Sequence, residues 1–336
     1  MIPASGRLPS EDEIRSVEGL WSITAYFNPL GKARRLENYR AFRAALRCRL
    51  VTVELGFGEF ALDTEDADIL VQIPGRDLLW QKERLLNVAM EQLPDDCDKV
   101  AWLDSDIVFV RSDWVAATSR ALDDHRIVQP FSTFQEILPP RNSEASSYVR
   151  VHGTRRASIA RRMIAGELPT RIFKGVGWGT KLRYAPGMAW AARREVLEEG
   201  LYDALILGGG DKAMASAIYG HHEATADTFE MSDRQRSHYA AWARRFHELT
   251  GGEAGFVRGE LFHYWHGRHD RRLLRPYEGF SKFNFDPASN IGIDEHGAWR
   301  WASEKPDLHR RCAHYLMYRE EDLESLPLES VGRPKE

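Results

Sequence analysis

The sequence has few cysteines, no long apolar run and almost no excess of one charge, and each shortage excludes a class of protein. Its three cysteines, Cys48, Cys97 and Cys312, are odd in number and far apart, which argues against a disulfide framework or a structural zinc site. No stretch reaches the roughly 18 apolar residues of a membrane span, and the first twenty residues lack the apolar core of a signal peptide. We therefore expect no transmembrane segment and a reducing, cytoplasmic location.

The charged residues nearly balance, since 46 lysines and arginines stand against 50 aspartates and glutamates and leave a net charge of −4. A general attraction to nucleic acid or to anionic membranes is therefore not expected. The chain of 336 residues is long enough for one large α/β domain with an extension, or for two smaller domains. It contains no evident internal repeat or low-complexity block.

Strand-like and helix-like patterns alternate along the chain, which predicts an α/β fold with a mostly parallel sheet and helices on both faces. Ligands of such sheets bind beyond the carboxyl ends of the strands. We expect strands at 21–29, 50–55, 68–73, 100–103, 127–131 and 186–192, and helices at 32–47, 78–93, 112–124, 149–166, 193–199 and 231–249.

The stretch KVAWLDSDIVFV, 99–110, places two carboxylates between apolar runs. Residues 100–103 have the continuous apolar pattern of a strand covered on both faces, and Asp104 and Asp106 follow at its end. Carboxylates in apolar surroundings are costly to desolvate unless a positive group meets them. Their oxygens are suitable ligands for Mg²⁺ or Mn²⁺. The pattern therefore predicts a cation beside these two acids.

The predicted helix 78–93 carries a lysine on its apolar side. Lys82 falls within about 40° of Leu86 on a helical wheel, along the stripe that should face the sheet. Its ammonium could meet a diphosphate or the Asp-x-Asp carboxylates, or it could reach water past the end of the helix. Arg84 points almost opposite and is expected to be solvated.

A second constellation is the run of three glycines, 208–210, directly before Asp211 and a helix-like segment. Glycines let the backbone approach a substrate closely, and here they place Asp211 in the first turn of the helix. Aspartate is also a favoured residue at a helix start, so this position alone does not assign a role to it.

Two other groups of residues have both a functional and a structural interpretation. His263 and His266 belong to HYWHG; neutral imidazole is a good ligand for Mn²⁺ and a poorer one for Mg²⁺, but a histidine taken alone is more often structural. The arginine-rich segment 149–166 could attract a phosphorylated acceptor or a lipid head group, or it could form a solvated helix face.

The chain resembles the GT-A glycosyltransferases, in particular bacterial and phage relatives of the families that contain galactosyl- and N-acetylgalactosaminyltransferases. The similarity rests on FNP after the first strand, on WQKERLLN, on WLDSDIVF and on HYWHG, and it extends over about 21–277. It implies a GT-A, Rossmann-like sheet with a C-terminal extension. It also implies transfer of a sugar from a nucleotide-sugar donor to a hydroxyl acceptor.

The resemblance implies a metal site. Asp104 and Asp106 would hold a divalent cation, with Mn²⁺ favoured over Mg²⁺, against the diphosphate of the donor. A histidine late in the domain often completes such a site, and His266 is the first choice for it, with His263 as the alternate ligand.

The resemblance also implies a catalytic base and two binding sites. Asp211 occupies the position of the base in inverting members, although the second acid usual beside it is absent, since Lys212 follows. The donor, expected to be UDP-linked, would contact Tyr26, Phe27, Asn28, Lys82, Arg84 and Ser105. The acceptor would contact Trp178, Gly209, Gly210 and Trp265.

The expected organisation has four parts. A flexible lead-in at 1–19 precedes a glycosyltransferase domain at 20–276, in which 20–131 would bind nucleotide and metal and 170–276 the acceptor. An extension at 277–326 should pack on this domain, and a tail at 327–336 should be disordered.

Two other functions are compatible with the sequence. A sugar-phosphate nucleotidyltransferase would carry a Gly-rich, basic loop after the first strand, whereas FNPLGKARR has a single glycine. A non-catalytic carbohydrate- or nucleic-acid-binding protein would use the ten tryptophans and the arginines, but it has little use for an Asp-x-Asp pair. A transferase with a nucleic-acid acceptor is less favoured because the net charge is negative.

Overall fold

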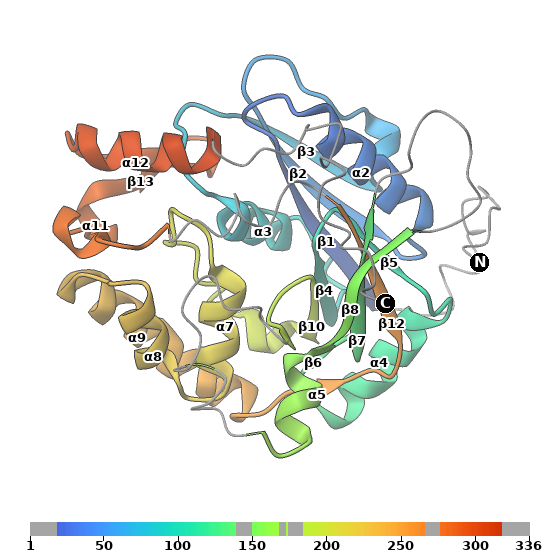
Figure 1. Cartoon of the computed structure of the whole chain (residues 1–336). Coiled ribbons are helices and arrows are strands. Elements are labelled where there is room, and N and C mark those ends of the chain that lie inside the picture. The colour runs from blue at the N-terminus through green and yellow to red at the C-terminus, as the bar shows by residue number, and fades with distance from the viewer. Residues whose placement is uncertain (1–18, 139–149, 168–172, 174–183, 266–275, 318–336) are drawn as a thin grey trace, which may run out of the picture.

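Seven strands form a central sheet that runs through the molecule (Figure 1). The computed structural model describes residues 19–138, 150–167, 173, 184–265 and 276–317. Strands β4, β1, β2 and β3 run parallel to one another, and β11 is parallel to β6, so the predicted mostly parallel α/β sheet is confirmed. In order across the sheet the strands are β11 (Gly255–Phe256), β6 (Ile127–Gln129), β10 (Ala189–Arg193), β4 (Lys99–Leu103), β1 (Leu20–Phe27), β2 (Leu50–Gly56) and β3 (Ile69–Pro74).

Strand β10 is the exception, because it runs antiparallel between β4 and β6. Ala189, its first residue, pairs with Leu103, the last residue of β4. Residues 186–188 therefore lie at the carboxyl edge of the parallel strands, where ligands of α/β sheets bind. The sequence predicts a strand here but not its direction.

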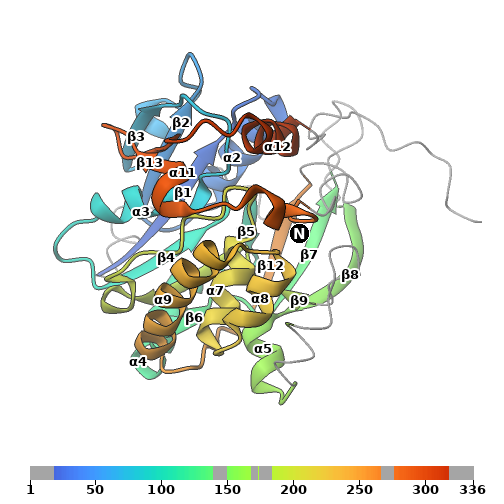
Figure 2. The same ribbon diagram turned by 90° about the vertical axis from the view of Figure 1, so that its left-hand side faces the viewer.

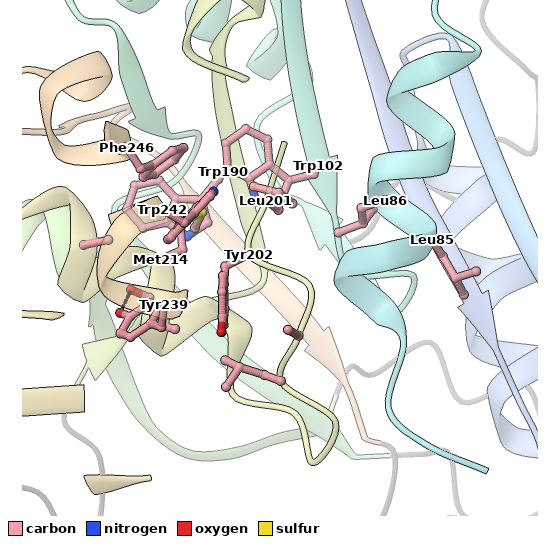
Figure 3. Packing of buried hydrophobic residues seen from close by; sticks show 14 of the residues in the cluster. Leu85, Leu86, Trp102, Trp190, Leu201, Tyr202, Met214, Tyr239, Trp242 and Phe246 are labelled. Carbon is pink, nitrogen blue, oxygen red and sulfur yellow. Dashed lines mark hydrogen bonds between the residues drawn. The ribbon is translucent and has the colours of Figure 1, made fainter. Parts of the chain in front are cut away.

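Each face of the sheet has its own hydrophobic core, because successive side chains of a buried strand point to opposite sides. On β4, Val100 and Trp102 belong to one core, and Ala101 and Leu103 belong to the other. Figure 3 shows Trp102 in the first core. Helices cover both cores, as predicted. The first core packs against α3 (Lys82–Glu91), α7 (Gly210–Ile218) and α9 (Asp233–Thr250), and the second packs against α2 (Ala33–Ala45) and α4 (Trp114–Asp124).

A second sheet of five strands carries the continuation of the Asp-x-Asp stretch. Strand β8 covers most of the arginine-rich segment, so the helix predicted over 149–166 is wrong for 150–158, and only α5 (Ile159–Ile164) is helical. The strand forms because it pairs with β7, a contact between segments that local sequence does not reveal. The order of this sheet is β5 (Ile107–Phe109), β12 (Glu260–Tyr264), β7 (Thr133–Leu138), β8 (Arg150–Ser158) and β9 (Tyr184–Ala185).

The segment 276–317 packs back onto the rest of the molecule near α3 (Figure 2). Tyr277, Phe280 and Leu308 are buried in the first core. Its elements are η3 (Phe280–Phe283), α11 (Pro287–Asn290), β13 (Ile291–Ile293), β14 (Trp299–Trp301) and α12 (Pro306–Met317). The remaining short helices are η1 (Thr64–Asp66), η2 (Arg194–Leu197) and α8 (His222–Thr228).

Two expectations, the lead-in apart from its last residue and the tail at 327–336, concern residues outside the described ranges.

All three cysteines are described, and all are buried free thiols. None of the helices in the described part of the chain combines the length and the apolar character that crossing a lipid bilayer requires.

Candidate active site

Backbone pairing fixes both acids of the Asp-x-Asp pair at the edge of the central sheet. Asp104 follows the last residue of β4, and its N–H donates to the carbonyl of Met188 just before β10 (2.7 Å). The carbonyl of Asp106 accepts a hydrogen bond from the N–H of Tyr264 at the end of β12 (2.8 Å). Both acidic side chains are partly buried. They therefore lie where the sequence predicts, directly after a buried strand.

Lys82 connects Asp104 to Asp211. Its ammonium forms an ion pair with Oδ1 of Asp104 and lies 3.3 Å from Oδ2 of Asp211. Only 16% of the lysine side chain is exposed, so of the two roles considered for it, contact with the carboxylates is the one observed. Burial lowers the pKa of Lys82, but the carboxylates of Asp104, Asp211 and Glu83 raise it by more, and the net shift is upward. The ammonium therefore stays charged at neutral pH.

Asp211 lies in the first turn of α7, as predicted. Burial raises the pKa of its carboxyl, Lys82 lowers it and Asp104 raises it again, and the net shift is upward. An aspartate with a raised pKa takes up a proton more readily than an exposed one. The carboxyl of Asp211 also touches the backbone of Gly187, where an added Cβ would lie 2.5 Å from Oδ2.

The loop before β10 is strained where it passes between the two acids. Met188 has a φ of 77°, in the left-handed region that residues with a side chain rarely adopt. Its carbonyl accepts the hydrogen bond from Asp104, and its neighbour Gly187 packs on Asp211. Strain of this kind costs about 1–3 kcal/mol and is concentrated at functional sites. It marks this edge of the sheet independently of the acids.

His263 lies beside Asp106, with Nε2 of the imidazole 3.3 Å from Oδ1 of the carboxylate. The two meet because β12 pairs antiparallel with β5 and sets His263 opposite Ile107. A carboxylate oxygen and an imidazole nitrogen are a donor pair that suits Mn²⁺. Within the described ranges no group of three or more His, Cys, Asp and Glu side chains is arranged to hold a metal ion. His266 lies outside those ranges, so its role as a ligand stays a prediction.

The backbone conformation and the close packing of the turn before Asp211 require glycines at 208–210. Gly208 and Gly209 have φ values of 76° and 93°. A Cβ on Gly210 would lie 2.2 Å from Oε1 of Glu83, and one on Gly209 would lie 2.6 Å from Cζ of Phe229. The close backbone approach expected at this turn is therefore made to protein side chains. Contact of Gly209 and Gly210 with an acceptor stays a prediction.

The donor-site candidates at the end of β1 and after β4 differ in burial. Tyr26 and Phe27 are only 3% and 4% exposed and pack against neighbouring aromatic rings. Oδ1 of Asn28 accepts from the N–H of Lys32 (2.9 Å), which fixes the entry into α2. Ser105, in the turn between the two acids, is partly exposed. Asn28 is also partly exposed, and contact of these four residues with a donor stays a prediction.

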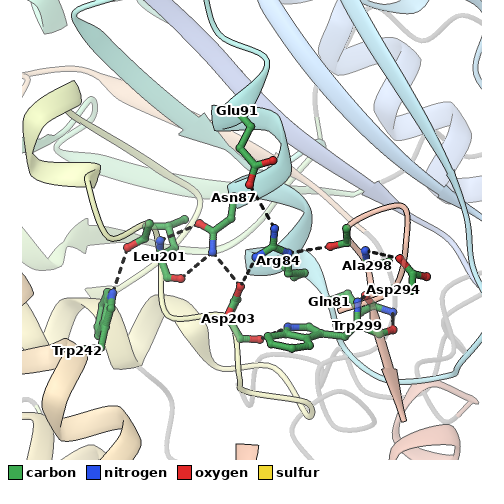
Figure 4. Close-up of polar contacts among 12 residues, drawn as sticks. Gln81, Arg84, Asn87, Glu91, Leu201, Asp203, Trp242, Asp294, Ala298 and Trp299 are labelled. Atoms are coloured by element: carbon green, nitrogen blue, oxygen red, sulfur yellow. Dashed lines mark hydrogen bonds and ion pairs between the residues drawn. The ribbon is translucent and has the colours of Figure 1, made fainter. Parts of the chain in front are cut away.

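Arg84 is not solvated, and the sequence expectation for it is corrected here. Its side chain is 12% exposed and donates to the carbonyl of Gly297 (2.8 Å). It also pairs with Asp203 (3.2 Å), as Figure 4 shows. The outward face of α3 is covered by segments that lie more than 100 residues further along the chain. The positive charge of Arg84 is thus used within the fold.

The side-chain amides of Gln81 and Asn87 also bond α3 to distant parts of the chain. The side chain of Gln81 accepts from the N–H of Trp299 (2.7 Å) and donates to the carbonyl of the same residue (3.1 Å), and Asn87 bonds in the same way to the backbone of Leu201 (2.8 and 2.9 Å) (Figure 4). We call Gln81, Arg84 and Asn87 the α3 clamp. It ties the start of α3 to the hairpin of β13 and β14 and to the segment that leads to α7. Helix α3 begins at Lys82, rather than at about 78 as predicted, and before it the N–H of Trp80 donates to the carbonyl of Ile206 (3.0 Å).

Glu83 is a residue of the site that sequence reasoning missed. Its buried carboxyl accepts from Nε1 of Trp80 (2.9 Å) and fills the space above Gly210. Burial raises its pKa from 4.5 to about 7; Lys82 opposes the shift and Asp211 adds to it. Glu83 stands four residues after Leu79 and three before Leu86, on the apolar stripe, and this spacing could have identified it.

Replacing Glu83 with glutamine should remove a pH dependence of stability. Between about pH 4.5 and 7 the unfolded chain has released this proton and the folded chain retains it, so the free energy of unfolding falls as pH rises. The loss should approach about 3 kcal/mol by pH 7, and then level off. Urea unfolding of wild type and Glu83→Gln at pH 4.5, 6 and 8 measures it. Parallel stability curves for the two proteins would contradict the expectation.

The acceptor-site candidates are only partly described. Trp178 lies outside the described ranges. Trp265 follows β12, and its backbone is held by the carbonyl of Ile137 (2.9 Å) and by Nδ2 of Asn38 (3.1 Å). Of the arginines in the basic segment, Arg155 pairs with Glu260. Arg155 is therefore an exposed residue of a strand, not part of the solvated helix face that was the alternative, and binding of a phosphorylated acceptor or a lipid head group by this segment stays a prediction.

No family model matches the sequence, and no curated protein matches it. The fold is similar to solved structures of glycosyltransferases. One is the mannosyltransferase PcManGT from Pyrobaculum calidifontis in complex with GDP-Man and Mn²⁺, at 13% identity and a TM-score of 0.38, over 89% of this chain and 70% of that one. Another is S. aureus TarS 1–349, at 13% identity and a TM-score of 0.32, over 68% of this chain and 71% of that one.

A third is glucosyl-3-phosphoglycerate synthase from Mycobacterium tuberculosis in complex with Mn²⁺, UDP-glucose and phosphoglyceric acid. It is 13% identical, with a TM-score of 0.33, over 86% of this chain and 88% of that one. At these identities and TM-scores the similarity assigns neither a substrate nor a residue role to this chain.

Proposed function

We propose that the protein is a metal-dependent glycosyltransferase that moves a sugar from a nucleotide-sugar donor, UDP-linked in the first instance, to a hydroxyl acceptor. The observation that carries this proposal is the bridge made by Lys82 between Asp104, at the carboxyl end of β4, and Asp211, at the head of α7. It joins a pair of acids suited to a metal-bound diphosphate to an acid suited to proton transfer. Both lie at the edge where α/β sheets bind ligands.

Asp106 and His263 are the residues of the described chain that would hold the metal, with Asp104 beside them. A divalent cation bound there supplies positive charge against the departing nucleoside diphosphate. The imidazole of His263 favours Mn²⁺ over Mg²⁺. The ion pair with Lys82 holds the side chain of Asp104 in place, and the ammonium adds to the positive potential at the same point.

Asp211 has the position and the basicity to take a proton from the acceptor hydroxyl. As the acceptor oxygen bonds to the anomeric carbon, the bond from that carbon to the donor phosphate breaks. The proton goes to Asp211, and the electron pair leaves with the nucleoside diphosphate. A base on the acceptor side implies attack opposite the leaving group and inversion at the anomeric carbon. General-base catalysis of this kind contributes about 10²–10⁴-fold to the rate.

The deciding experiment measures thermal stability with a panel of sugar nucleotides, with Mn²⁺, with Mg²⁺ and with EDTA. A UDP-sugar should raise the melting temperature only when metal is present, because the cation and Asp106 hold the diphosphate together. Asp106→Ala should abolish the shift. Asp113→Ala is the matched control, since Asp113 is an exposed aspartate paired with Arg111 and a surface pair contributes little.

Parallel reactions, one with a sugar nucleotide and one with a nucleoside triphosphate, separate the other functions by their products. A glycosyltransferase releases a nucleoside diphosphate from the sugar nucleotide, whereas a nucleotidyltransferase releases pyrophosphate from a nucleoside triphosphate. Sugar-nucleotide binding that is indifferent to EDTA and to Asp106→Ala, without any turnover, would replace the proposal with a non-catalytic binding protein.

A further inference from the structure

Lys212 is a partly buried cation in the first turn of α7. Its ammonium lies over the ring of Phe229, 5.5 Å from the centroid. Among the described residues it makes no hydrogen bond and no ion pair, whereas Lys82 and Lys99 both contact carboxylate oxygens. A buried ammonium without such a partner costs free energy unless a ligand supplies the anion.

Three acids on the segments around Lys212 and Phe229, namely Asp211, Glu83 and Glu230, have other partners. Asp211, on the same helix, faces Lys82, and Glu83 of α3 is bonded to Trp80. Glu230, next to Phe229, accepts from the N–H of Gly279. The hydroxyl of Tyr277, whose ring stacks on Phe229, donates to the carbonyl of Gly208. Burial alone shifts the pKa of Lys212, and it lowers the value to about 8.

The ring beneath the ammonium packs on the turn that leads to the proposed base. Phe229, on which it lies, touches Gly209 in the turn that leads directly to Asp211. The base and the unpartnered cation are consecutive residues at the head of α7.

We propose that Lys212 binds an oxyanion on the acceptor, so that the substrate is a hydroxyl compound carrying a phosphate or carboxylate group near the hydroxyl that reacts. This inference rests on the proposed function and specifies its acceptor. The cation supplies the counter-charge for the acceptor's anion, and Asp211 beside it receives the proton of the hydroxyl.

The test uses three small probes with the full chain, with the donor site filled by UDP and Mn²⁺. Glycerol 3-phosphate, glycerate and glycerol share hydroxyl groups and differ in charge. We expect one or both anions to bind the wild type. The same anions should bind Lys212→Met at least tenfold more weakly. Glycerol should show no measurable binding to either protein. Whichever anion binds more tightly distinguishes a phosphate from a carboxylate acceptor. Calorimetry provides the dissociation constants.

Lys282→Met is the matched control, because Lys282 also lies over an aromatic ring, that of Phe283 (5.0 Å), but is exposed. It should bind the anions like the wild type. Equal binding by wild type and Lys212→Met, or no binding of either anion to the wild type, would overturn the proposal. Binding of UDP with Mn²⁺ is measured separately in each protein. Its absence would count against the glycosyltransferase assignment and leave the anion result standing.

A pH series gives a readout that a purely structural lysine would not change. Glycerate and the bound UDP both keep their charge between about pH 7 and 9, so a loss of affinity in this range comes from the protein. Because the anion requires a protonated Lys212, affinity should fall as pH rises through about 8 in the wild type and in Lys282→Met. The weak residual binding of Lys212→Met should be flat, and an identical slope in that variant would count against the assignment.

Discussion

Exchanging Lys82 for methionine is expected to lower the rate of sugar transfer by about 10²–10³-fold, the cost typical of losing one electrostatic donor at a reaction centre. Asp104 and Asp211 lose the ammonium that they share. The free energy of unfolding should fall by about 2 kcal/mol, because hydrogen bonds to charged groups contribute on that order. Steady-state kinetics with a UDP-sugar and urea unfolding of the same preparation measure both effects.

The pH profile of this variant provides an independent check. Lys82 lowers the pKa of Asp211, so its removal should raise that pKa. The acid limb of the rate profile should then move to higher pH, since the base must be deprotonated to act. Lys82→Arg keeps the charge and should recover part of the rate. A methionine variant within a few-fold of wild type would show that the bridge has no role in the reaction.

Replacing Asp211 with asparagine is expected to reduce kcat by about 10²–10⁴-fold while the donor KM changes little. The amide keeps the size of the carboxyl beside Gly187 but cannot take up a proton. Transfer to the acceptor measures the loss, and calorimetry with UDP and Mn²⁺ measures donor binding. A retaining enzyme does not need this base, and a kcat near that of wild type would point to retention.

Asp203→Asn is the comparison for this variant. Asp203 is also a partly buried aspartate bonded to a cation, but its partners Arg84 and Asn87 belong to the α3 clamp. Its replacement should lower stability and leave the shape of the pH profile unchanged. If Asp203→Asn and Asp211→Asn lose activity in proportion to stability, the effect of Asp211→Asn is structural.

The sequence pattern was sufficient to predict the features that depend on residues close together in the chain. The continuous apolar run before Asp104 predicted a strand buried on both faces, and helical spacing placed Lys82 on the side of α3 that faces the sheet. The three glycines predicted that Asp211 would start a helix. In each case the period of the backbone and the cost of burying a charge decide the outcome.

The sequence-based expectations that were wrong concern contacts between segments that are distant along the chain. Arg84 was expected in solvent, but Gly297 and Asp203 cover it. The segment 150–158 was expected to be helical, but pairing with β7 makes it a strand. Register between β12 and β5, which local sequence cannot give, is what brings His263 to Asp106.

The α3 clamp also has a consequence for the timing of biosynthesis. Gln81 and Trp299 are 218 positions apart, so the bonds that fix the start of α3 cannot form until the ribosome has passed the second partner. At about 5–20 residues per second, the helix that bears Lys82 waits roughly 10–40 s for its last neighbour. A nascent chain released before residue 299 would contain every residue proposed to react. It would still lack the two bonds between Gln81 and Trp299 that fix the start of α3.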